Sequence, residues 1–163
     1  MPVSGDEFKL LLRQFAAGVT VVTFSEGGTK GGLTVSSFSS VSLDPPLISI
    51  CVARHLASHD PIARSGAFAV NICTHDQGKL AWDFASGKID KHELLESVDH
   101  TMSDLGNPLI TGSAARIDCK LVHQFDGGDH TIFVGQVEGG GANDDAETLL
   151  YFRGRMGRFE PTS

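Results

Sequence analysis

Short runs of apolar and β-branched residues, each closed by Gly, Pro or Asp, recur along this chain and constrain its fold more than any other feature. Runs of this length and composition are typical of strands. Seven or eight strands are expected, in residues 19–25, 31–35, 47–53, 67–73, 114–125, 130–138, 149–152 and 156–159. No regular alternation with helices accompanies them, so a closed antiparallel barrel is favoured over a parallel sheet.

The start of the chain predicts a helix. Ser4 and Glu7 have the spacing of a capping box. Apolar side chains follow at i, i+3, i+4 and i+7, which places them on one helical face, at Phe8, Leu11, Leu12 and Phe15. Gly18 is expected to end this helix.

Shorter helices are expected in the middle of the chain. Residues 60–61 are Asp-Pro and suit a helix with proline at its first position, ending near Gly66. Two further helices are expected over residues 77–84 and 90–97. Stretches with few periodic cues are expected to be loops, at residues 99–112 and 139–147.

The segment of residues 34–46 reads TVSSFSSVSLDPP. It cannot be a helix, because Ser and Thr side chains compete for backbone hydrogen bonds and proline stops a helix. It predicts a strand end, a hydroxyl-rich loop and a short strand ending at Pro45-Pro46. Hydroxyls and backbone N–H groups at a strand end can hold a polar heterocycle or a phosphate without adding charge. The alternative is a solvated loop in which serine only forms turns.

Two other places could carry chemistry. Residues 126–129 form a strong hairpin turn, and His130 follows it as either an exposed turn residue or a protonatable donor beside a ligand. Arg153, Arg155 and Arg158 cluster in an otherwise acidic chain. They form either a solvated strand face or a clamp for phosphate.

Several classes of protein are disfavoured. The 163 residues fit one domain, residues 1–163, with its core near residues 8–159. Thirteen Lys and Arg against twenty Asp and Glu give a net charge of −7, which argues against nucleic acid and anionic membranes as partners. The sequence carries no secretory signal pattern and no apolar run that could cross a bilayer, so a cytoplasmic protein is expected.

Metal and common nucleotide motifs are also disfavoured. Cys51, Cys73 and Cys119 fit neither a disulfide framework nor a metal knuckle and are expected to be small buried side chains. His55 and His59 have helical spacing, but the following proline implies that the helix only begins there, so no metal site is expected. The glycine patterns of dinucleotide-binding and P-loop folds do not occur, nor does G-x-S-x-G.

The motifs occur together in one order. The chain reads FAAGVTVVT at residues 15–23, GLTVSSF at 32–38, VSLDPPL at 41–47, FAVN at 68–71, GDH at 128–130, GQV at 135–137 and LY at 150–151. In this order and spacing it closely resembles the flavin reductase-like family, from about residue 8 to residue 159. Members of this family are the small reductase components of two-component flavin monooxygenases.

The resemblance implies a mainly β fold, the FMN-binding split barrel, an antiparallel Greek-key barrel that forms homodimers. It implies that NADH or NADPH reduces FMN or FAD, and that the reduced flavin diffuses to a separate monooxygenase component. Two other interpretations stay open. One is a non-catalytic flavin- or haem-binding split-barrel protein, and the other is an oxidase related to the pyridoxamine-phosphate oxidases.

By matching position, the resemblance also implies a set of binding residues. Those expected to contact flavin or nicotinamide nucleotide are Thr34, Val35, Ser36, Ser37, Ser40, Cys51, Val52, Ala53, Ser58, His59, Phe84, Ala85, His130, Tyr151 and Arg155. Ser58 and His59 fall where the family binds the flavin phosphate, and His130 is the expected catalytic residue at the nicotinamide–flavin contact. The family often has Lys-Phe after the midchain helix, where this chain has Lys91-His92.

Overall fold

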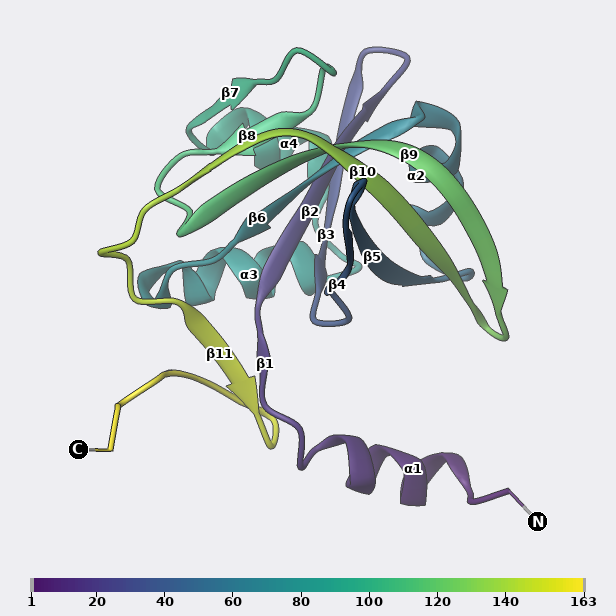
Figure 1. The fold of residues 1–163 in the computed structure, drawn as a ribbon, viewed down its shortest axis with the longest axis vertical. Coiled ribbons are helices and arrows are strands. Elements are labelled where there is room, and N and C mark those ends of the chain that lie inside the picture. Colours follow the sequence, from purple (N-terminus) through teal and green to yellow (C-terminus); the bar gives the residue numbers. More distant parts are fainter. Residues whose placement is uncertain (1, 163) are drawn as a thin grey trace.

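The computed structural model describes residues 2–162, and its largest unit is a seven-stranded antiparallel sheet (Figure 1). Its strand order is β3-β2-β6-β9-β10-β5-β4. The strands are β2 (Thr20–Glu26), β3 (Thr29–Val35), β4 (Ser39–Leu43), β5 (Pro46–Ala53), β6 (Ala67–Ile72), β9 (Ala115–Gly127) and β10 (His130–Ala142). Beyond β3, the Ser37 hydroxyl exchanges hydrogen bonds of 3.0 Å with the main-chain N–H and C=O of Cys51 in β5, so the sheet curls towards a barrel.

Two small sheets flank this barrel. One has the order β1-β11-β12 and joins the N- and C-terminal segments, with β1 (Ala17–Gly18), β11 (Leu149–Phe152) and β12 (Arg155–Arg158). The other is the hairpin of β7 (His100–Met102) and β8 (Pro108–Ile110).

In the part of the chain that the structure describes, four α-helices complete the fold: α1 (Gly5–Leu12), α2 (His59–Ser65), α3 (Gly78–Ala85) and α4 (Lys91–Ser97). A single 3-10 turn, His75–Gln77, leads into α3. Figure 1 shows α3 beside the sheet and α1 extending away from the body at the N-terminus. Within residues 2–162, no helix is both long and apolar enough to cross a membrane.

The core has two parts. The larger fills the barrel with side chains from its strands and from α2, including Val22, Ile50, Phe68 and Phe133. The smaller packs α3 and α4 against the barrel, with Val21, Phe84 and Leu95 fully buried. Burial of these apolar side chains supplies the main favourable term for the fold.

The expected strands are confirmed, and so are several local signals. Ser4 and Glu7 form the capping box in full. The turn at residues 27–28 joins β2 to β3, and both glycines there have positive φ angles of 59° and 85°. Gly66 ends α2 in the left-handed conformation, with φ of 70°, which a residue with a Cβ adopts at a cost.

Other expectations about element limits are wrong. The first helix ends at Leu12 rather than at Gly18, because Gly18 pairs with Leu150 in the small sheet. Pro61 is the third residue of α2, since Ser58 is the N-cap and His59 begins the helix. β10 continues to Ala142, pairing with β9 through residues expected to be loop.

The hairpin of β7 and β8 replaces part of a predicted loop. Tertiary hydrogen bonds hold it: the N–H of Ile110 donates to Asn71 Oδ1 at 2.8 Å, and the Thr23 hydroxyl donates to the carbonyl of Pro108. Asn71 is fully buried and also donates to the carbonyl of Val21 at 3.0 Å. Buried amides need such partners, and these are distant in sequence, so local periodicity could not reveal the hairpin.

Two of the three cysteines are buried as expected. Cys73 and Cys119 are buried free thiols, and burial raises the pKa of each to about 12. Both therefore stay protonated near neutral pH and act as small apolar side chains. Cys51 is half-buried on β5.

Candidate functional site

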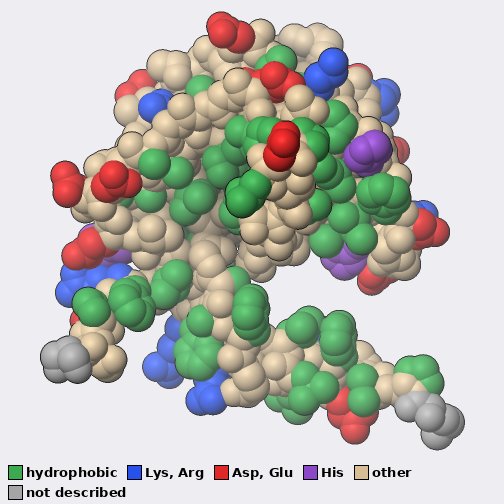
Figure 2. Space-filling model, viewed as in Figure 1, with side chains coloured by type: hydrophobic (Ala, Val, Ile, Leu, Met, Phe, Trp, Pro, Cys, Tyr) green, Lys and Arg blue, Asp and Glu red, His purple; other side chains and the backbone are tan. Residues whose placement is uncertain are grey.

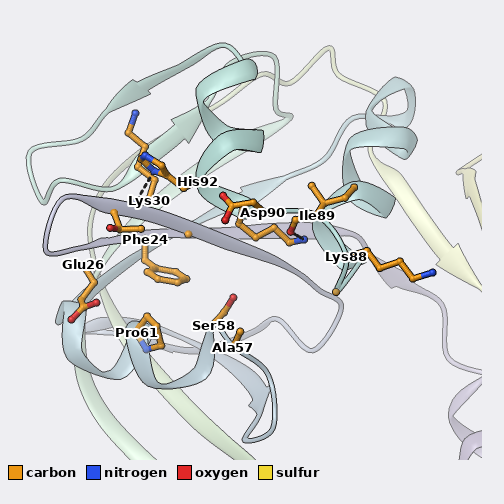
Figure 3. Close-up of a pocket in the computed structure, with 14 residues that line it drawn as sticks. Phe24, Glu26, Lys30, Ala57, Ser58, Pro61, Lys88, Ile89, Asp90 and His92 are labelled. Carbon is orange, nitrogen blue, oxygen red and sulfur yellow. Dashed lines mark hydrogen bonds between the residues drawn. The ribbon is translucent and has the colours of Figure 1, made fainter.

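Four cavities follow one another around β3 and the loop after it. The first, of about 430 Å³, lies between β3, the start of α2 and the α3–α4 loop (Figure 3). The second, of about 240 Å³, shares Ala57, Ser58 and Ile89 with the first. The third, also about 240 Å³, shares Thr34 and Ala85 with the second. We term the whole series the β3 groove.

The fourth cavity extends the β3 groove to the N-terminal helix. It measures about 640 Å³ and shares Ser36 and Tyr151 with the third. Its other lining residues come from α1 and the segment after it up to β1, from the serine-rich loop up to the start of β4, and from the β11–β12 turn: Lys9, Leu12, Arg13, Phe15, Ala17, Ser37, Phe38, Ser39 and Arg153. Cavities of several hundred Å³ with a few convergent polar groups are typical ligand sites.

The groove wall at α3 is fixed by two contacts with β3. The Thr34 hydroxyl donates to the carbonyl of Ala81. A Cβ on Gly32 would lie 2.7 Å from Cε1 of Phe84 and 3.0 Å from the carbonyl oxygen of Val22, so only glycine lets this ring pack against the strand. Phe84 is 1% exposed, so its ring belongs to the core. The residue still borders the second cavity of the groove.

The expected hydroxyls are not equally available. The hydroxyls of Thr34 and Ser37 already donate to main-chain carbonyls, those of Ala81 and Cys51. Within residues 2–162, Ser36 Oγ makes no hydrogen bond, and Ser36 lines both the third and the fourth cavities. Ser36 is therefore the hydroxyl of this loop that lies in the groove with its donor unused.

Val35 and Ser40 lie away from the groove lining. Val35 is 4% exposed and belongs to the barrel core. Ser40 lies on the edge strand β4, where it pairs with Ile48. Neither side chain is brought to the groove.

The three expected residues of β5 point in alternate directions. Val52 is 1% exposed and packs in the barrel core. Cys51 and Ala53 lie on the other face, opposite Ile132 and His130 of β10. Only Cys51 is linked to the hydroxyl-rich loop, through the main-chain bonds to Ser37.

Ser58 and His59 separate in the structure. Ser58 lines the first two cavities, and its hydroxyl donates to the carbonyl of Gly32 at 3.4 Å. His59 turns to β10 instead: Nε2 lies 2.8 Å from Thr131 Oγ1, and Nδ1 lies 2.7 Å from Asp60 Oδ1. With its side chain 14% exposed, the His59 ring supports β10 and does not line the groove.

His130 lies at the start of β10, opposite Ala53. Its Nδ1 lies 2.6 Å from Asp129 Oδ1, and this contact lowers the pKa of the Asp129 carboxyl through hydrogen bonding and charge. Arg54 holds the hairpin in place with a 2.7 Å ion pair to Asp126. The ring is 43% exposed and lies outside the lining of the four cavities.

The C-terminal hairpin contributes Tyr151 to the third and fourth cavities. Arg155, also expected at the site, starts β12 and is not among the lining residues. Arg153 lines the fourth cavity instead, and its guanidinium donates to Gln14 Oε1 at 2.6 Å.

Sequence reasoning missed several lining residues. Trp82, Met156, Ile89 and Lys91 border the groove but carried no predicted role. Trp82 had a usable signal, since it lies on the exposed side of α3 and is 54% exposed. The signal in the sequence is that Leu80, Ala81 and Phe84 form the apolar face of this helix, which leaves the large apolar Trp82 outside it.

The structure now defines a class, an antiparallel split barrel with a long groove along one edge. The family model of the flavin reductase-like domain matches residues 12–160. The chain belongs to the flavin reductase-like family, so the resemblance seen in the sequence and the expected split-barrel fold are both confirmed.

Curated relatives and solved structures agree with this assignment. A reductase subunit of a flavin-dependent monooxygenase from Rhodococcus jostii is 38% identical, over 94% of this chain and 77% of that protein. An NADH-dependent FAD reductase from Streptomyces globisporus is 36% identical, over 95% of this chain and 86% of that protein.

Two solved structures cover nearly all of both chains. The flavin reductase component of a bacterial two-component tryptophan halogenase superposes with a TM-score of 0.91 at 32% identity, covering 98% of this chain and 100% of that one. The NADH:FAD oxidoreductase of Streptomyces globisporus, in complex with NAD and FAD fragments, gives a TM-score of 0.88 at 34% identity, covering 99% and 98%.

Proposed function

We propose that this chain is an NAD(P)H:flavin oxidoreductase that binds FAD or FMN in the β3 groove and delivers reduced flavin to a separate monooxygenase component. The charge of the groove's second, third and fourth cavities carries the proposal, whereas the first cavity is lined by Glu26 and Asp90 as well as by lysines. Among the described residues, those lining the second, third and fourth cavities include no Asp or Glu but include Lys9, Arg13, Lys91 and Arg153. In a chain of net charge −7, this segregation suits an anionic ligand such as a flavin nucleotide.

The residues present fit a flavin. Ser36 Oγ is an unused donor, and the Ala85 and Trp82 side of α3 supplies an apolar wall opposite it. Ser58 lies further along the groove, where a ribityl phosphate would extend. The ring system and the phosphate of one flavin therefore have matching surfaces in consecutive cavities.

The chemistry needs little from the protein beyond placement. Bound flavin supplies the acceptor for the hydride that leaves C4 of the nicotinamide, so NAD(P)H, flavin and one proton become NAD(P)⁺ and reduced flavin. Ser36 would orient the polar edge of the ring, and the α3 wall would exclude water. A hydride leaves with its electrons, so no side chain of the groove must act as a general base.

His130 is the residue that we propose at the nicotinamide. Its half-exposed ring is held by Asp129 through Nδ1, which leaves Nε2 free for a hydrogen bond with a ligand that approaches β10. We expect Arg155 and Tyr151 to lie on the nucleotide side of the same ligand. His130→Ala should raise the KM for NADH more than it weakens flavin binding, and equal NADH kinetics would remove His130 from the mechanism.

We also propose a homodimer. Large apolar side chains stay exposed on α1 and on the edge strand β4, including Phe8 at 52%, Leu11 at 63%, Phe15 at 77% and Leu43 at 95%. Figure 2 shows hydrophobic side chains along α1, which stands apart from the body. Exposed apolar surface of this kind marks an interface, and a second copy that covers it agrees with the family. Light scattering should give twice the chain mass, whereas a monomer mass would contradict the proposal.

The remaining expectations concern domain organisation, location in the cell and partners. We expect one domain over residues 1–163, with its core near residues 8–159, working in the cytoplasm without nucleic acid or membrane partners. The free thiols of Cys51, Cys73 and Cys119 support a reducing compartment.

The test of the function is NADH or NADPH consumption in air with added FAD or FMN. Turnover that rises with flavin concentration supports the proposal. Flavin binding without turnover would overturn it and favour a non-catalytic flavin-binding protein. The same assay ranks the two flavins and the two nicotinamide nucleotides.

A further inference from the structure

The first cavity of the β3 groove extends past the place proposed for the flavin phosphate. It measures about 430 Å³ and shares Ala57, Ser58 and Ile89 with the second cavity. FMN ends at its phosphate, whereas FAD continues through a second phosphate to an adenosine. With the phosphate beside Ser58, FMN would leave the first cavity unfilled, and FAD would reach into it.

Two carboxylates line this cavity, Glu26 and Asp90. Each uses one oxygen within the fold: Glu26 Oε1 accepts from Arg64 Nε at 3.0 Å, and Asp90 Oδ1 accepts from the N–H of Glu93 at 2.9 Å. Among residues 2–162, their other oxygens make no hydrogen bond, so each is free to accept one from a ligand.

The three lysines of the cavity are engaged or directed elsewhere. Lys30 Nζ donates to Glu96 Oε1 at 2.7 Å, and Lys91 Nζ donates to main-chain carbonyls at the end of α3 and in the loop after it. Figure 3 shows the side chain of Lys88 extending away from the cavity. The cavity therefore suits an uncharged group that carries a hydrogen-bond donor better than it suits a further phosphate.

His92 supplies the cavity with a donor. Its Nδ1 accepts from the main-chain N–H of Lys30 at 3.2 Å, the contact that the dashed line in Figure 3 marks. The neutral ring therefore carries its proton on Nε2. Nε2 makes no hydrogen bond within the described residues, and His92 lines the cavity. This donor is a departure of the present chain, since the family often has phenylalanine at this position.

Apolar side chains close the cavity on its inner side. Phe24 lies opposite Gly31 in the β2–β3 ladder, and a Cβ on Gly31 would lie 2.3 Å from Phe24 Cζ, so only glycine leaves room for the ring. Pro61 and Ile89 add further apolar surface to the lining. Apolar surface with a few placed polar groups is the usual setting for a flat heterocycle.

We infer that the first cavity binds the adenosine of FAD, so that this chain uses FAD in preference to FMN. The edge of adenine carries a ring nitrogen that accepts a hydrogen bond and an amino group that donates one. These match the Nε2–H of His92 and the unused carboxylate oxygens of Glu26 and Asp90. The inference rests on the proposed function for the flavin phosphate beside Ser58, and it makes His92 a residue that determines specificity.

The experiment measures the Kd of FAD and of FMN by isothermal titration calorimetry. Wild type should bind FAD at least about tenfold more tightly, because only FAD fills the first cavity. His92→Asn keeps an oxygen that can accept from the Lys30 N–H but has no donor in the place of Nε2. Its Kd for FAD should rise about fivefold, the loss of one hydrogen bond, while its Kd for FMN stays unchanged.

Two matched variants separate the ligand contact from the structural one. His92→Gln places an amide N–H near the position of Nε2 and should keep most of the affinity for FAD. His123→Asn makes the same exchange as His92→Asn at an exposed histidine of β9, outside the cavity, and should change neither Kd. If His92→Asn does not fold, as judged by its thermal transition, competition with adenosine decides. Adenosine should raise the apparent Kd of wild type for FAD and leave that for FMN unchanged.

Three outcomes would overturn the inference. Equal Kd values of FAD and FMN for wild type would do so, and so would an equal loss of both flavins in His92→Asn. The third is a higher KM for NADH in His92→Asn, with FMN as acceptor and an unchanged Kd for FAD, which would assign the cavity to the adenosine of the nicotinamide nucleotide. Wild-type turnover tests the proposed oxidoreductase separately, so the preference for FAD can fail while the activity holds.

Discussion

Two hollows of the molecule differ in the charge of the side chains that line them. The β3 groove has no carboxylate among the described residues of its second to fourth cavities. A separate cavity of about 490 Å³, termed here the acidic cavity, lies between the β7–β8 hairpin and the β9–β10 ladder and is lined by Asp104, Asp118 and Glu138. An anion is attracted to the first and repelled by the second, so charge rather than volume distinguishes a ligand site here.

The two hollows also differ in how their polar groups are satisfied. In the acidic cavity, Asp118 is 5% exposed and accepts from Nδ2 of the buried Asn107 at 2.8 Å. In the groove, Ser36 keeps an unused hydroxyl. Polar groups that are already paired stabilise a fold, whereas an unused donor in a cavity is available to a ligand.

The largest effect on flavin affinity is expected from adding a methyl group at a glycine beside the groove. Gly32→Ala would place a Cβ 2.7 Å from Phe84 Cε1 and should displace α3 from the groove, reducing flavin affinity at least about 100-fold. Gly139→Ala lies at the acidic cavity, where a Cβ meets nothing within 4 Å, and should leave affinity unchanged. Flavin titration of both variants checks this, and equal affinities would contradict the role given to the groove.

The next test adds a carboxylate to the groove and removes one from the acidic cavity. Ser36→Asp would put a carboxylate between the third and fourth cavities and should lower kcat/KM for flavin reduction about 30-fold, with less loss at high salt. Glu138→Gln removes a carboxylate from the acidic cavity and should leave kcat/KM as it is. Steady-state kinetics at two salt concentrations measures both, and a similar loss in the two variants would break the contrast.

In a third test, a change at the acidic cavity should lower stability and leave flavin affinity unchanged. Asn107→Ala leaves the buried Asp118 carboxylate without its amide donor and should lower the free energy of unfolding by about 1–2 kcal/mol. Flavin affinity should not change, because neither residue lines the groove. Urea unfolding followed by flavin titration measures the two quantities, and a loss of affinity without a loss of stability would count against the assignment.

The smallest effect concerns pH. Burial raises the pKa of both Cys73 and Cys119 to about 12, and Asp118 and Glu138 add to the shift only at Cys119. Unfolding then releases protons above the ordinary thiol pKa of 9.0, so stability should fall as pH rises from about 9 to 12. Glu138→Gln should lower the pKa of Cys119 and leave that of Cys73 unchanged. Thiolate absorbance of single-cysteine variants during a pH titration tests this.

The strands and the turns were predictable because their signals are local. Alternating apolar residues and glycine turns at residues 27–28 and 127–128 need no distant partner to be recognised. The β7–β8 hairpin was not predictable, since it depends on Asn71 and Thr23, which lie far from it in the sequence.

The candidate site was predictable only in outline. The sequence located a hydroxyl-rich segment, but it could not reveal that Thr34 and Ser37 donate to main-chain carbonyls while Ser36 does not. Which hydroxyl stays available depends on the packing of α3 and β5 around the loop. The same holds for Lys91, whose ammonium donates to the main-chain carbonyls of Asp83, Ser86 and Ile89.

The N-terminal helix α1 buries none of its side chains, so it depends on its capping box, its backbone bonds, an exposed Lys9–Asp6 ion pair and the hydrogen bond from its C-cap Arg13 to the carbonyl of Arg153. An eight-residue helix is marginal in water on such terms. Its order is therefore linked by mass action to whatever covers its apolar face. Dilution of the protein should unwind α1 before the barrel unfolds. A loss of helical signal in far-ultraviolet circular dichroism across a dilution series would therefore measure the dissociation of two copies.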